Sequence, residues 1–564
     1  MSIYFETTRR DFLKTSLATV GTAALSRHLA LAQAPAKYRR YNVTSNQGKQ
    51  ALYSYAKAIQ AMLKLPPDHP QNWFRNAFIH LMDCPHGNWW FYVWHRGYLG
   101  YFEQTIRTMS GDPNFAMPYW DWSQLSQIPD TMFNDVLTPV ASAFEPYTKD
   151  LDTFTAFIQP SLKNYWKGLS QAQIQQLNIR GYKTFDDMWN DVSGWTPTPM
   201  TGHLSHPGHF NPENTAFAPT KIARYLTLGN AQLSASVKKN VSKETVYSGL
   251  EPTNFATTYY QHIPIANPIK IGFNSSTTAS HNTAPSQGTV FSTLEGLPHN
   301  STHNYIGGGA GPGTPIPNGP WGNMTNNLSP VDPIFFLHHS NMDRLWDVWT
   351  RKQQALNLPY LPDSRQLPSY EKEPFLFYVD GNGKQVGPSI AREYINMSHF
   401  GYDYEPGFGE EIIGKRPLVL AAKQSAAPVK GLMKANTATL TLSAASIKTH
   451  LDSDTETSLF ALVTVPRPTE KSPNREFDVL VGAPADATNV TPDSPYYAGK
   501  VAFFCGMMHM SGMTEDATFI VPLPKRKEAF ANLSAAAGNV AVTIRAVPSG
   551  GGASVLRAVT VQSL

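Results

Sequence analysis

Long apolar runs are missing from this 564-residue sequence, apart from one weakly apolar segment close to its N-terminus. A stretch of about 20 apolar residues is needed to cross a bilayer, so we expect no membrane span in the mature chain. Blocks of basic residues are also missing, and the formal net charge is only +4 at pH 7. This charge pattern argues against a nucleic-acid partner.

Cysteine is scarce as well, since Cys84 and Cys505 are the only two. A disulfide between them is possible in an oxidising compartment. Apolar side chains, by contrast, make up 41% of the chain and aromatic side chains 12%. This content can fill a large core, and 564 residues exceed one ordinary domain, so we expect two domains.

The first 34 residues have the features of an export signal. Arg9 and Arg10 precede a weakly apolar stretch over residues 15–31, which ends in small residues around Ala32. This order predicts a twin-arginine signal peptide over residues 1–34, with cleavage favoured after Ala32. We therefore expect the chain to meet an export machinery and to reach the periplasm or the medium.

Two histidines four residues apart, His299 and His303, stand at the centre of the sequence pattern. On a helix, both imidazoles leave the same face one turn apart and can reach one metal ion. Pro298 predicts that this helix begins there. No Glu follows His299, so the zinc-protease pattern is absent.

A third imidazole, His339, lies in a strongly apolar helical pattern that begins at Pro333. Three histidines from two helices, without thiolate or carboxylate, suit copper, zinc, iron or nickel. The simpler alternative is a pair of buried histidines satisfied by hydrogen bonds. That alternative would be preferred if this cluster stood alone.

A second cluster comprises His80, His86 and His95, which fall within sixteen residues of the most aromatic stretch of the chain. His80 ends an apolar helix pattern, His86 lies in a Pro/Gly loop, and His95 opens another helix. A histidine buried among aromatic rings must be neutral and either hydrogen-bonded or metal-bound. Two such clusters predict two metal ions that face each other between helix pairs.

These motifs, together with Pro118-Tyr-Trp-Asp-Trp122, resemble the type-3 copper oxidases, the family of tyrosinases, catechol oxidases and haemocyanins, here in a bacterial secreted form. The resemblance covers roughly residues 38–405. It implies a mainly α catalytic domain at residues 35–408, with a central helix bundle that holds a dicopper site. It assigns His80, His86 and His95 to copper A and His299, His303 and His339 to copper B, with His338 only a neighbour.

The resemblance also implies roles for residues beside the ligands. Asp343 is expected to orient a ligand imidazole. Glu295 and Asn300 match positions thought to hold the water that deprotonates a phenol. As structural residues, they would instead be a helix-start acid and a cap. Cys84 is expected to be joined to His86 by a thioether bond, and the disulfide with the second cysteine is the alternative.

The family's catalytic domain closes with a Tyr-x-Tyr pair, which Tyr402-Asp-Tyr404 resembles, and Arg40 is the candidate partner of this pair. Three further histidines lie three residues apart in a Gly/Pro loop, which prevents a shared helical face. We interpret them as structural or as a weak adventitious site: His203, His206 and His209.

After a linker at residues 409–435, residues 436–564 predict an all-β sandwich of seven short strands. The strands are expected at residues 437–442, 459–465, 476–481, 501–504, 518–521, 540–544 and 556–561. In the family, such a domain often covers the copper site and is removed on activation. Residues 503–513 are the candidate plug or copper-handling segment, with Phe504, Cys505, Met508 and His509. A Met-rich core strand or turn is the alternative for this segment.

The sequence thus predicts a secreted enzyme that uses two copper ions and O2 to hydroxylate monophenols and to oxidise o-diphenols to o-quinones. A catechol or o-aminophenol oxidase without hydroxylase activity is one alternative. A haemocyanin-like O2 carrier or copper-binding protein is another. The expected partners are a small phenolic substrate and a copper chaperone.

Overall fold

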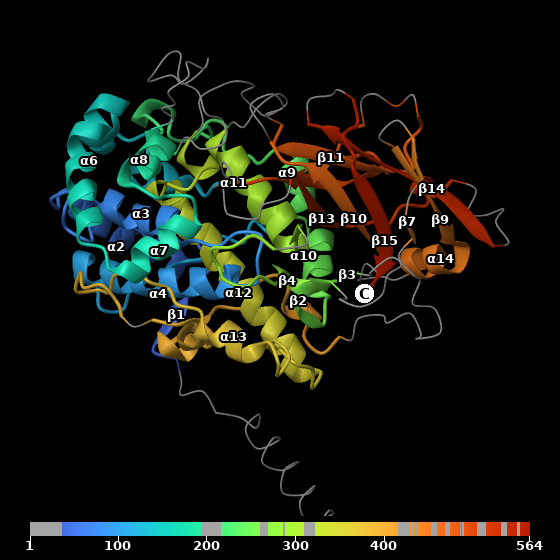
Figure 1. Cartoon of the computed structure of the whole chain (residues 1–564), viewed down its shortest axis with the longest axis horizontal. Coiled ribbons are helices and arrows are strands. Elements are labelled where there is room, and N and C mark those ends of the chain that lie inside the picture. The colour runs from blue at the N-terminus through green and yellow to red at the C-terminus, as the bar shows by residue number, and fades with distance from the viewer. Residues whose placement is uncertain are drawn as a thin grey trace, which may run out of the picture.

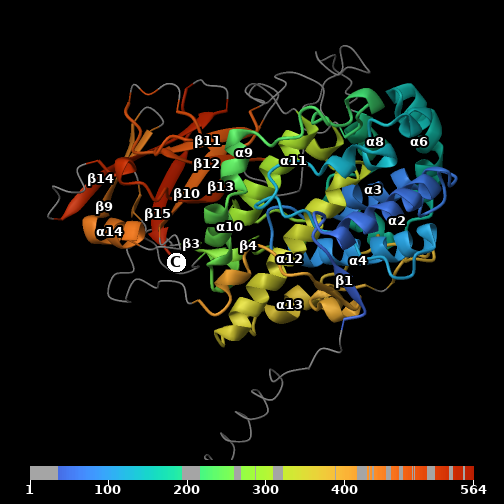
Figure 2. The same cartoon turned by 180° about the vertical axis from the view of Figure 1, so that it is seen from behind.

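The computed structural model divides into a helical part and a β part that lie side by side (Figure 1; Figure 2 shows the same division from behind). It describes residues 36–564 except 194–215, 260–268, 286–287, 309–321, 388, 416–428, 431, 435–436, 453–458, 469–473, 486, 488–489, 505–514, 532–537 and 550–552. The predicted signal peptide lies outside the described residues. Among those described, none of the helices combines the length and the apolar character that a bilayer crossing requires.

Four helices form the centre of the helical part: α2 (Asn46–Leu63), α3 (Trp73–Asp83), α4 (Phe91–Ser110) and α12 (Ile334–Ala355). The first two begin at side-chain caps. Ser45 accepts a hydrogen bond from the Gly48 amide, and Asn72 accepts from the amides of Phe74 and Arg75. Such caps satisfy amides that have no partner within the helix. Aromatic rings join the helices, because Phe102 of α4 stacks on Phe336 of α12 with 3.5 Å between centroids.

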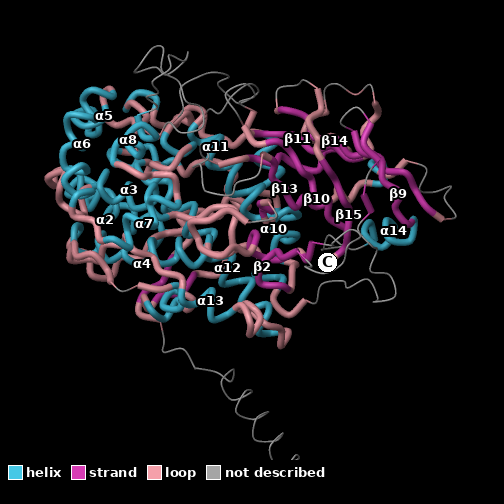
Figure 3. Tube along the Cα trace, in the orientation of Figure 1, coloured by secondary structure: helices cyan, strands magenta, loops and turns pink. Residues whose placement is uncertain are grey.

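The remaining helices surround this centre, as the cyan segments of Figure 3 show. They are α5 (Glu145–Thr148), α6 (Leu151–Lys167), α7 (Gln171–Ile179), α8 (Phe185–Ser193), α9 (Ala235–Asn240), α10 (Lys243–Leu250), α11 (Asn300–Gly307) and α13 (Leu367–Lys372), with α14 (Ala444–Asp452) on the β part. A helical domain with a central bundle is therefore confirmed.

Two small sheets complete the helical part. β1 (Tyr38–Arg40) pairs in parallel with β6 (Tyr402–Tyr404), which brings the two ends of the predicted catalytic domain together. The second sheet has the order β3 (Ile269–Lys270), β2 (Asn254–Tyr259), β4 (Gly272–Ser276).

The β part contains all seven predicted strands: β9 (Thr437–Ser443), β10 (Leu459–Pro466), β11 (Glu476–Val481), β12 (Tyr497–Ala502), β13 (Asp516–Pro522), β14 (Asn539–Pro548) and β15 (Ala558–Ser563). They form two sheets over one hydrophobic core. Along β9, buried positions alternate with less buried ones, as expected for a strand with one face inward. The predicted C-terminal β fold is confirmed.

The boundary between the two parts differs from the expected one in two respects. β7 (Val429–Lys430) and β8 (Leu432–Lys434) fall within the predicted linker, yet they pair with β15 and β9. In addition, β5 (Thr289–Phe291), which precedes the second histidine motif, pairs in parallel with β13. The helical part thus supplies an outer strand of one sheet of the β part. Residues 416–428 of the predicted linker lie outside the described residues.

Candidate metal centre

Three histidines of the N-terminal half form one cluster. His80 lies near the end of α3, His86 in the following loop, and His95 in the first half of α4. Their ring centroids make a nearly equilateral triangle, with 5.5 Å between His80 and His86 and 5.7 Å along both other sides. The indole ring of Trp94 packs against two of them, 5.8 Å from His80 and 4.9 Å from His95.

His299, His303 and His339 form the second cluster, as their spacing predicts. Nε2 of His339 lies 3.4 Å from Nε2 of His299 and 3.1 Å from Nε2 of His303. All three side chains are completely buried. Three ring nitrogens thus converge on one point that water does not reach.

In four of these rings, the hydrogen bond at Nδ1 shows that Nε2 is the nitrogen free to bind a metal. The Nδ1 atom of His80 lies 2.8 Å from the carbonyl oxygen of Asn327, and that of His95 lies 2.7 Å from the carbonyl oxygen of Phe91. The Nδ1 atom of His303 lies 2.8 Å from the carbonyl oxygen of Met324, and that of His299 lies 2.7 Å from Oδ1 of Asn300. A carbonyl oxygen can only accept, so each Nδ1 carries the proton. Each Nε2 therefore has a free lone pair, the form in which histidine binds metals.

His338, which lies next to His339 in the chain, differs from these four rings. The indole Nε1 of Trp122, which can only donate, lies 3.2 Å from Nδ1 of His338. Nδ1 must therefore accept, which leaves the proton of the neutral ring on Nε2. His338 lies within reach of the second cluster, but its Nε2 has no lone pair to offer. Its interpretation as a neighbour of His339 agrees with this bond.

Burial keeps the imidazoles neutral. It lowers the pKa of His80 to about 3 and that of His299 to about 3. The pKa values of His86, His95, His303 and His339 also lie well below the ordinary value, because burial disfavours the charged ring and the neighbouring histidines add to the effect. Converging lone pairs on neutral, buried rings repel each other, and a cation between them removes that repulsion.

The two clusters face each other directly. The rings of His95 and His339 stack with centroids 4.1 Å apart and planes inclined by 7°, and those of His86 and His299 lie 5.7 Å apart. Each group holds several possible ligand atoms within 4.8 Å of one another. Imidazole-only sets suit copper or zinc rather than calcium or magnesium. The site therefore fits two ions of this kind.

Cys84 also belongs to the first cluster. Its Sγ lies 3.2 Å from Nδ1 and 3.6 Å from Nε2 of His86. Both nitrogens are bonded to the same ring carbon, Cε1, so sulfur and this carbon are close neighbours. The possible disulfide partner, Cys505, lies outside the described residues.

Glu295 begins a π-helical turn, Glu295–His299, that leads directly into α11. The helix was expected to begin at Pro298, but it begins one turn earlier, and Pro298 lies inside it. Oε1 of Glu295 accepts a hydrogen bond of 2.6 Å from the Gly87 amide, and Oε2 accepts one of 2.5 Å from Ser275 Oγ. Burial nevertheless raises the pKa of Glu295 to about 7.

Asn300 and Phe504 connect the metal centre to the β part. Oδ1 of Asn300 accepts from His299, while its Nδ2 donates to the Ala502 carbonyl, 2.7 Å away. The Phe504 ring lies 4.3 Å from the ring of His303, and 4.7 Å from that of His86. It therefore contacts both clusters. The other members of the candidate plug lie outside the described residues: Cys505, Met508 and His509.

Asp343 was expected to orient a ligand imidazole. Among the described residues it does not do so, and this expectation is wrong. Instead of holding a ligand imidazole, its buried carboxylate accepts hydrogen bonds from Arg40, Arg96, Tyr402 and Tyr404. Backbone carbonyls hold the Nδ1 atoms of His80, His95 and His303, and Asn300 holds that of His299, so these four rings need no carboxylate. Arg40 does join the Tyr-x-Tyr pair, as expected, with its guanidinium 3.6 Å above the Tyr402 ring.

A buried charge cluster near the first histidine triad was not predicted. His281 lies between two carboxylates, with Nε2 3.0 Å from Asp83 and Nδ1 2.5 Å from Glu373. Asp83 ends α3 and also accepts from the Trp94 indole N–H at 2.8 Å. These residues are far apart in sequence and form no motif, so no local signal could have revealed them.

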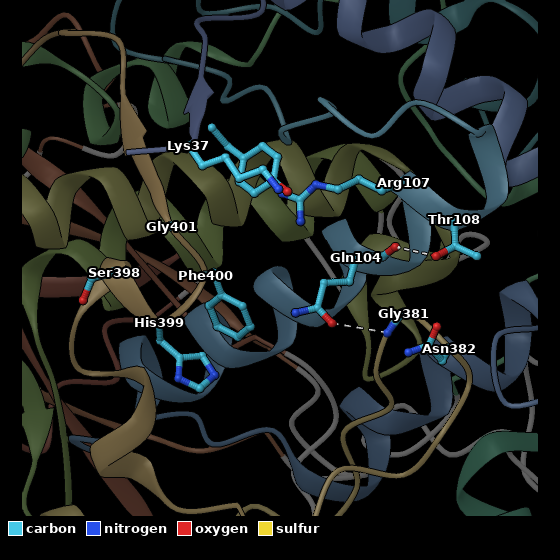
Figure 4. A pocket seen from close by; sticks show the side chains of 11 residues that line it. Lys37, Gln104, Arg107, Thr108, Gly381, Asn382, Ser398, His399, Phe400 and Gly401 are labelled. Atoms are coloured by element: carbon cyan, nitrogen blue, oxygen red, sulfur yellow. Dashed lines mark hydrogen bonds between the residues drawn. The ribbon is translucent and has the colours of Figure 1, made fainter. Parts of the chain in front are cut away.

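The surface also has a depression of about 510 Å³ beside the C-terminal half of α4 (Figure 4). Lys37 and Arg107 supply its positive charge, and Gln104, Asn382 and His399 contribute polar groups. It shares no residue with either histidine cluster, and it contributes nothing to the metal centre.

Known proteins are similar to this chain. A family model described as the common central domain of tyrosinase matches residues 53–352. The chain is 25% identical over 368 residues to a chloroplastic polyphenol oxidase of Malus domestica, covering 62% of this chain and 46% of that protein. It is 31% identical over 109 residues to A-type hemocyanin units Ode to Odg of Enteroctopus dofleini, covering 19% of this chain and 8% of that protein.

A solved structure has a similar fold. Recombinantly expressed latent aurone synthase (polyphenol oxidase), co-crystallized with hexatungstotellurate(VI), aligns with a TM-score of 0.50 at 18% identity, over 94% of this chain and 90% of that one. The chain spans about half the length of the plant polyphenol oxidases it matches. The family model covers more than half of the chain, and all six clustered histidines fall within the match. This chain belongs to the tyrosinase family of type-3 copper proteins.

Proposed function

We propose that this protein is a copper-dependent phenol oxidase, which hydroxylates monophenols and oxidises o-diphenols to o-quinones with O2. The observation that carries the proposal is the pair of facing histidine triads, with His80, His86 and His95 for one copper ion and His299, His303 and His339 for the other. When bound, two such ions would supply the redox chemistry that phenol oxidation by O2 requires. The protein residues then have three tasks: to bind the phenol, to take its proton and to exclude water.

Glu295 is the proposed base for the phenol proton. A general base works best when its pKa lies near the operating pH, and the pKa of Glu295 is about 7. Its two hydrogen bonds, from Gly87 and Ser275, hold the carboxylate beside the loop of His86. The proton passes from the phenol, directly or through water, to this carboxylate. Such a base matters most for monophenols, which are harder to deprotonate than catechols.

Asn300 is the proposed partner of Glu295 in holding the water. In this structure, where the β part contacts the site, Oδ1 of Asn300 is bonded to His299 and its Nδ2 to Ala502. Release of the Ala502 carbonyl would free Nδ2 to hold a water or a substrate oxygen. Docking of the β part thus affects this side chain as well as access to the metals.

Phe504 is the proposed plug of a latent form. Its ring is 7% exposed and occupies the space between His303 and His86. A phenol ring that approaches both clusters needs this space. We therefore propose that the β part blocks the site and that its movement or removal activates the enzyme.

Three further proposals concern maturation. Cys84 Sγ and Cε1 of His86 become joined by a thioether, which their proximity supports. The mature protein is periplasmic or secreted through the twin-arginine pathway, on the strength of Arg9 and Arg10. A copper chaperone delivers the metal.

Oxygen uptake by the copper-loaded chain after cleavage within residues 416–428, which should relieve the block by the β part, tests the activity. With tyrosine and with catechol as substrates, we expect quinone formation from both. Quinone from catechol alone would show a catechol oxidase without hydroxylase activity. Reversible O2 binding without quinone would show a carrier and overturn the proposal.

A further inference from the structure

A buried arginine, Arg180, binds the backbone just before the loop that carries His86. It is the C-cap residue of α7 and is almost fully buried. Its Nη2 donates to the carbonyl of Cys84 at 2.9 Å and to that of Leu81 at 3.4 Å. Its Nη1 donates to Oδ1 of Asn282 at 2.8 Å. The guanidinium thus meets the chain at the point where α3 ends.

The end of α3 needs a hydrogen-bond donor from outside the helix. The last carbonyls of a helix have no amide partner within it, and the residue after Cys84 is Pro85, which has no N–H to offer. An arginine near a helix C-terminus can bond such carbonyls, and its charge is favourable at the negative end of the helix. Arg180 fills this role for α3, although it lies 96 residues after Cys84 in the sequence.

The loop after α3 is also held at its other end. Gly87 has a positive φ of 69°, and its amide donates to Oε1 of Glu295 at 2.6 Å. A guanidinium therefore holds a carbonyl at the start of the loop, and a carboxyl group holds an amide at its end. His86 lies between these two points.

His86 depends on this loop more than the other two ligands of its cluster depend on their backbone. Backbone carbonyls hold the Nδ1 atoms of His80 and His95. Among the described residues, only the sulfur of Cys84 lies within hydrogen-bonding distance of the ring nitrogens of His86, at 3.2 and 3.6 Å. The orientation of this ring is therefore determined by the loop backbone and by Cys84.

We propose that Arg180 is a positioning residue for the Cys84–His86 thioether, because it holds the backbone of Cys84 where Sγ lies beside Cε1 of His86. This inference deepens the proposed function and rests on the maturation proposed there. Without the guanidinium, the carbonyls of Leu81 and Cys84 lose this donor. The start of the loop is then free to move, and Sγ spends less time against the ring.

The linking step balances with O2 as the oxidant. The S–H bond of Cys84 and the Cε1–H bond of His86 break, and one S–C bond forms between the two residues. The two hydrogens leave as two protons and two electrons, which O2 takes up to give H2O2. The peptide loses two hydrogens, so the link is visible as a change in its mass.

The rate of linking tests the proposal in the full chain. Protein produced without copper is loaded with copper in air, and the peptide that contains residues 84–86 is followed by mass over time. We expect Arg180→Met to link about tenfold more slowly than the wild type, since it loses hydrogen bonds from a charged donor. Arg180→Lys keeps a cation that can bond one carbonyl, and it should link at an intermediate rate.

Lys352 provides a matched control near the C-terminal end of α12. It is also a fully buried cation that donates to backbone carbonyls, those of Leu250 at 2.6 Å and Glu251 at 2.8 Å. Lys352→Met should lower the free energy of unfolding, as Arg180→Met does, yet link at the wild-type rate. Equal slowing in the two methionine variants would reflect a general loss of stability and would overturn the proposal.

Catechol oxidation by the same proteins, after cleavage within residues 416–428, separates this inference from the proposed function. If Arg180→Met links as fast as the wild type, or if the wild type does not link, the positioning role is wrong. Quinone formation by the wild type then leaves the phenol oxidase standing. If the wild type links and Arg180→Met does so more slowly, but no quinone forms from catechol or tyrosine, the role of Arg180 stands and the proposed function is overturned.

Discussion

The indole N–H of Trp122 lies 3.2 Å from Nδ1 of His338, and this bond determines which of two adjacent histidines can bind a metal. It fixes the proton of His338 on Nε2. Among the described residues, no donor reaches Nδ1 of His339, and its Nε2 meets those of His299 and His303. Trp122 belongs to the Pro118-Tyr-Trp-Asp-Trp122 motif, which thereby acquires a physical role beside the second cluster.

Copper content should distinguish the two histidines. His339→Ala removes one of three ligands, and we expect the loss of about one copper ion per chain, measured by elemental analysis. His338→Gln keeps a donor and should retain both ions. Equal copper loss in the two variants would show that His338 is a ligand as well.

The pH dependence of monophenol oxidation should report on Glu295. The carboxylate form accepts the proton, so the rate should rise as the pH passes through about 7, the pKa of this group. In Glu295→Gln we expect the rise to disappear and tyrosine oxidation to fall about 100-fold, with a smaller loss for catechol. Equal losses for both substrates would assign Glu295 a structural role.

Ser275→Ala offers a finer test of the same carboxylate. The hydrogen bond from Ser275 lowers the pKa of Glu295 and so partly offsets the effect of burial. Without it, the pKa should rise, and the pH profile for tyrosine should move to higher pH. A profile that moves to lower pH, or stays unchanged, would contradict the assignment of the base.

The Cys84–His86 bond should be visible by mass. The peptide that contains both residues should be lighter by two hydrogens in the copper-loaded protein, and the link should survive reductant. Cys84→Ser provides the unlinked control. A reducible link from Cys84 to Cys505 would show a disulfide instead.

His281 should make stability depend on pH. Burial alone would lower its pKa, but the carboxylates of Asp83 and Glu373 outweigh burial and raise it. The charged ring therefore stabilises the fold fully below its unfolded pKa of about 6.5, and the contribution is lost as pH rises through the folded pKa. His281→Gln leaves two carboxylates buried without their cation and should cost about 3 kcal/mol at pH 6 in denaturant unfolding.

The comparison of the two proteins across pH isolates this group. The difference in unfolding free energy between wild type and His281→Gln should shrink from pH 6 towards higher pH. A constant difference would mean that His281 is neutral in the folded protein.

Local sequence patterns predicted most of the site. The four-residue spacing of His299 and His303 and the aromatic context of His95 are short-range signals, and the structure places these residues as expected. Partners distant in sequence were harder to foresee. Asp343 was expected beside an imidazole because it lies one turn from His339, yet Arg40, more than 300 residues earlier, binds it.

Strand pairing between the helical part and the β part was also hard to predict, because the paired strands are far apart in the sequence. Residues 289–291 are Thr-Val-Phe, residue types that favour strands, but a run of three is too short to predict a strand, and β5 depends on its pairing with β13. The helix start expected at Pro298 was wrong for a different, local reason. A π-helical turn accommodates this proline inside the helix, a local irregularity that often occurs at functional sites.

Oxygen uptake with catechol, before and after cleavage of the copper-loaded chain within residues 416–428, tests the central claim most directly. The account predicts weak uptake by the intact protein, because Phe504 fills the space between the histidine clusters. After cleavage it predicts a rise of several-fold, with quinone formed and both copper ions retained. A protein that binds two copper ions, yet takes up no oxygen with catechol in either form, would contradict the account.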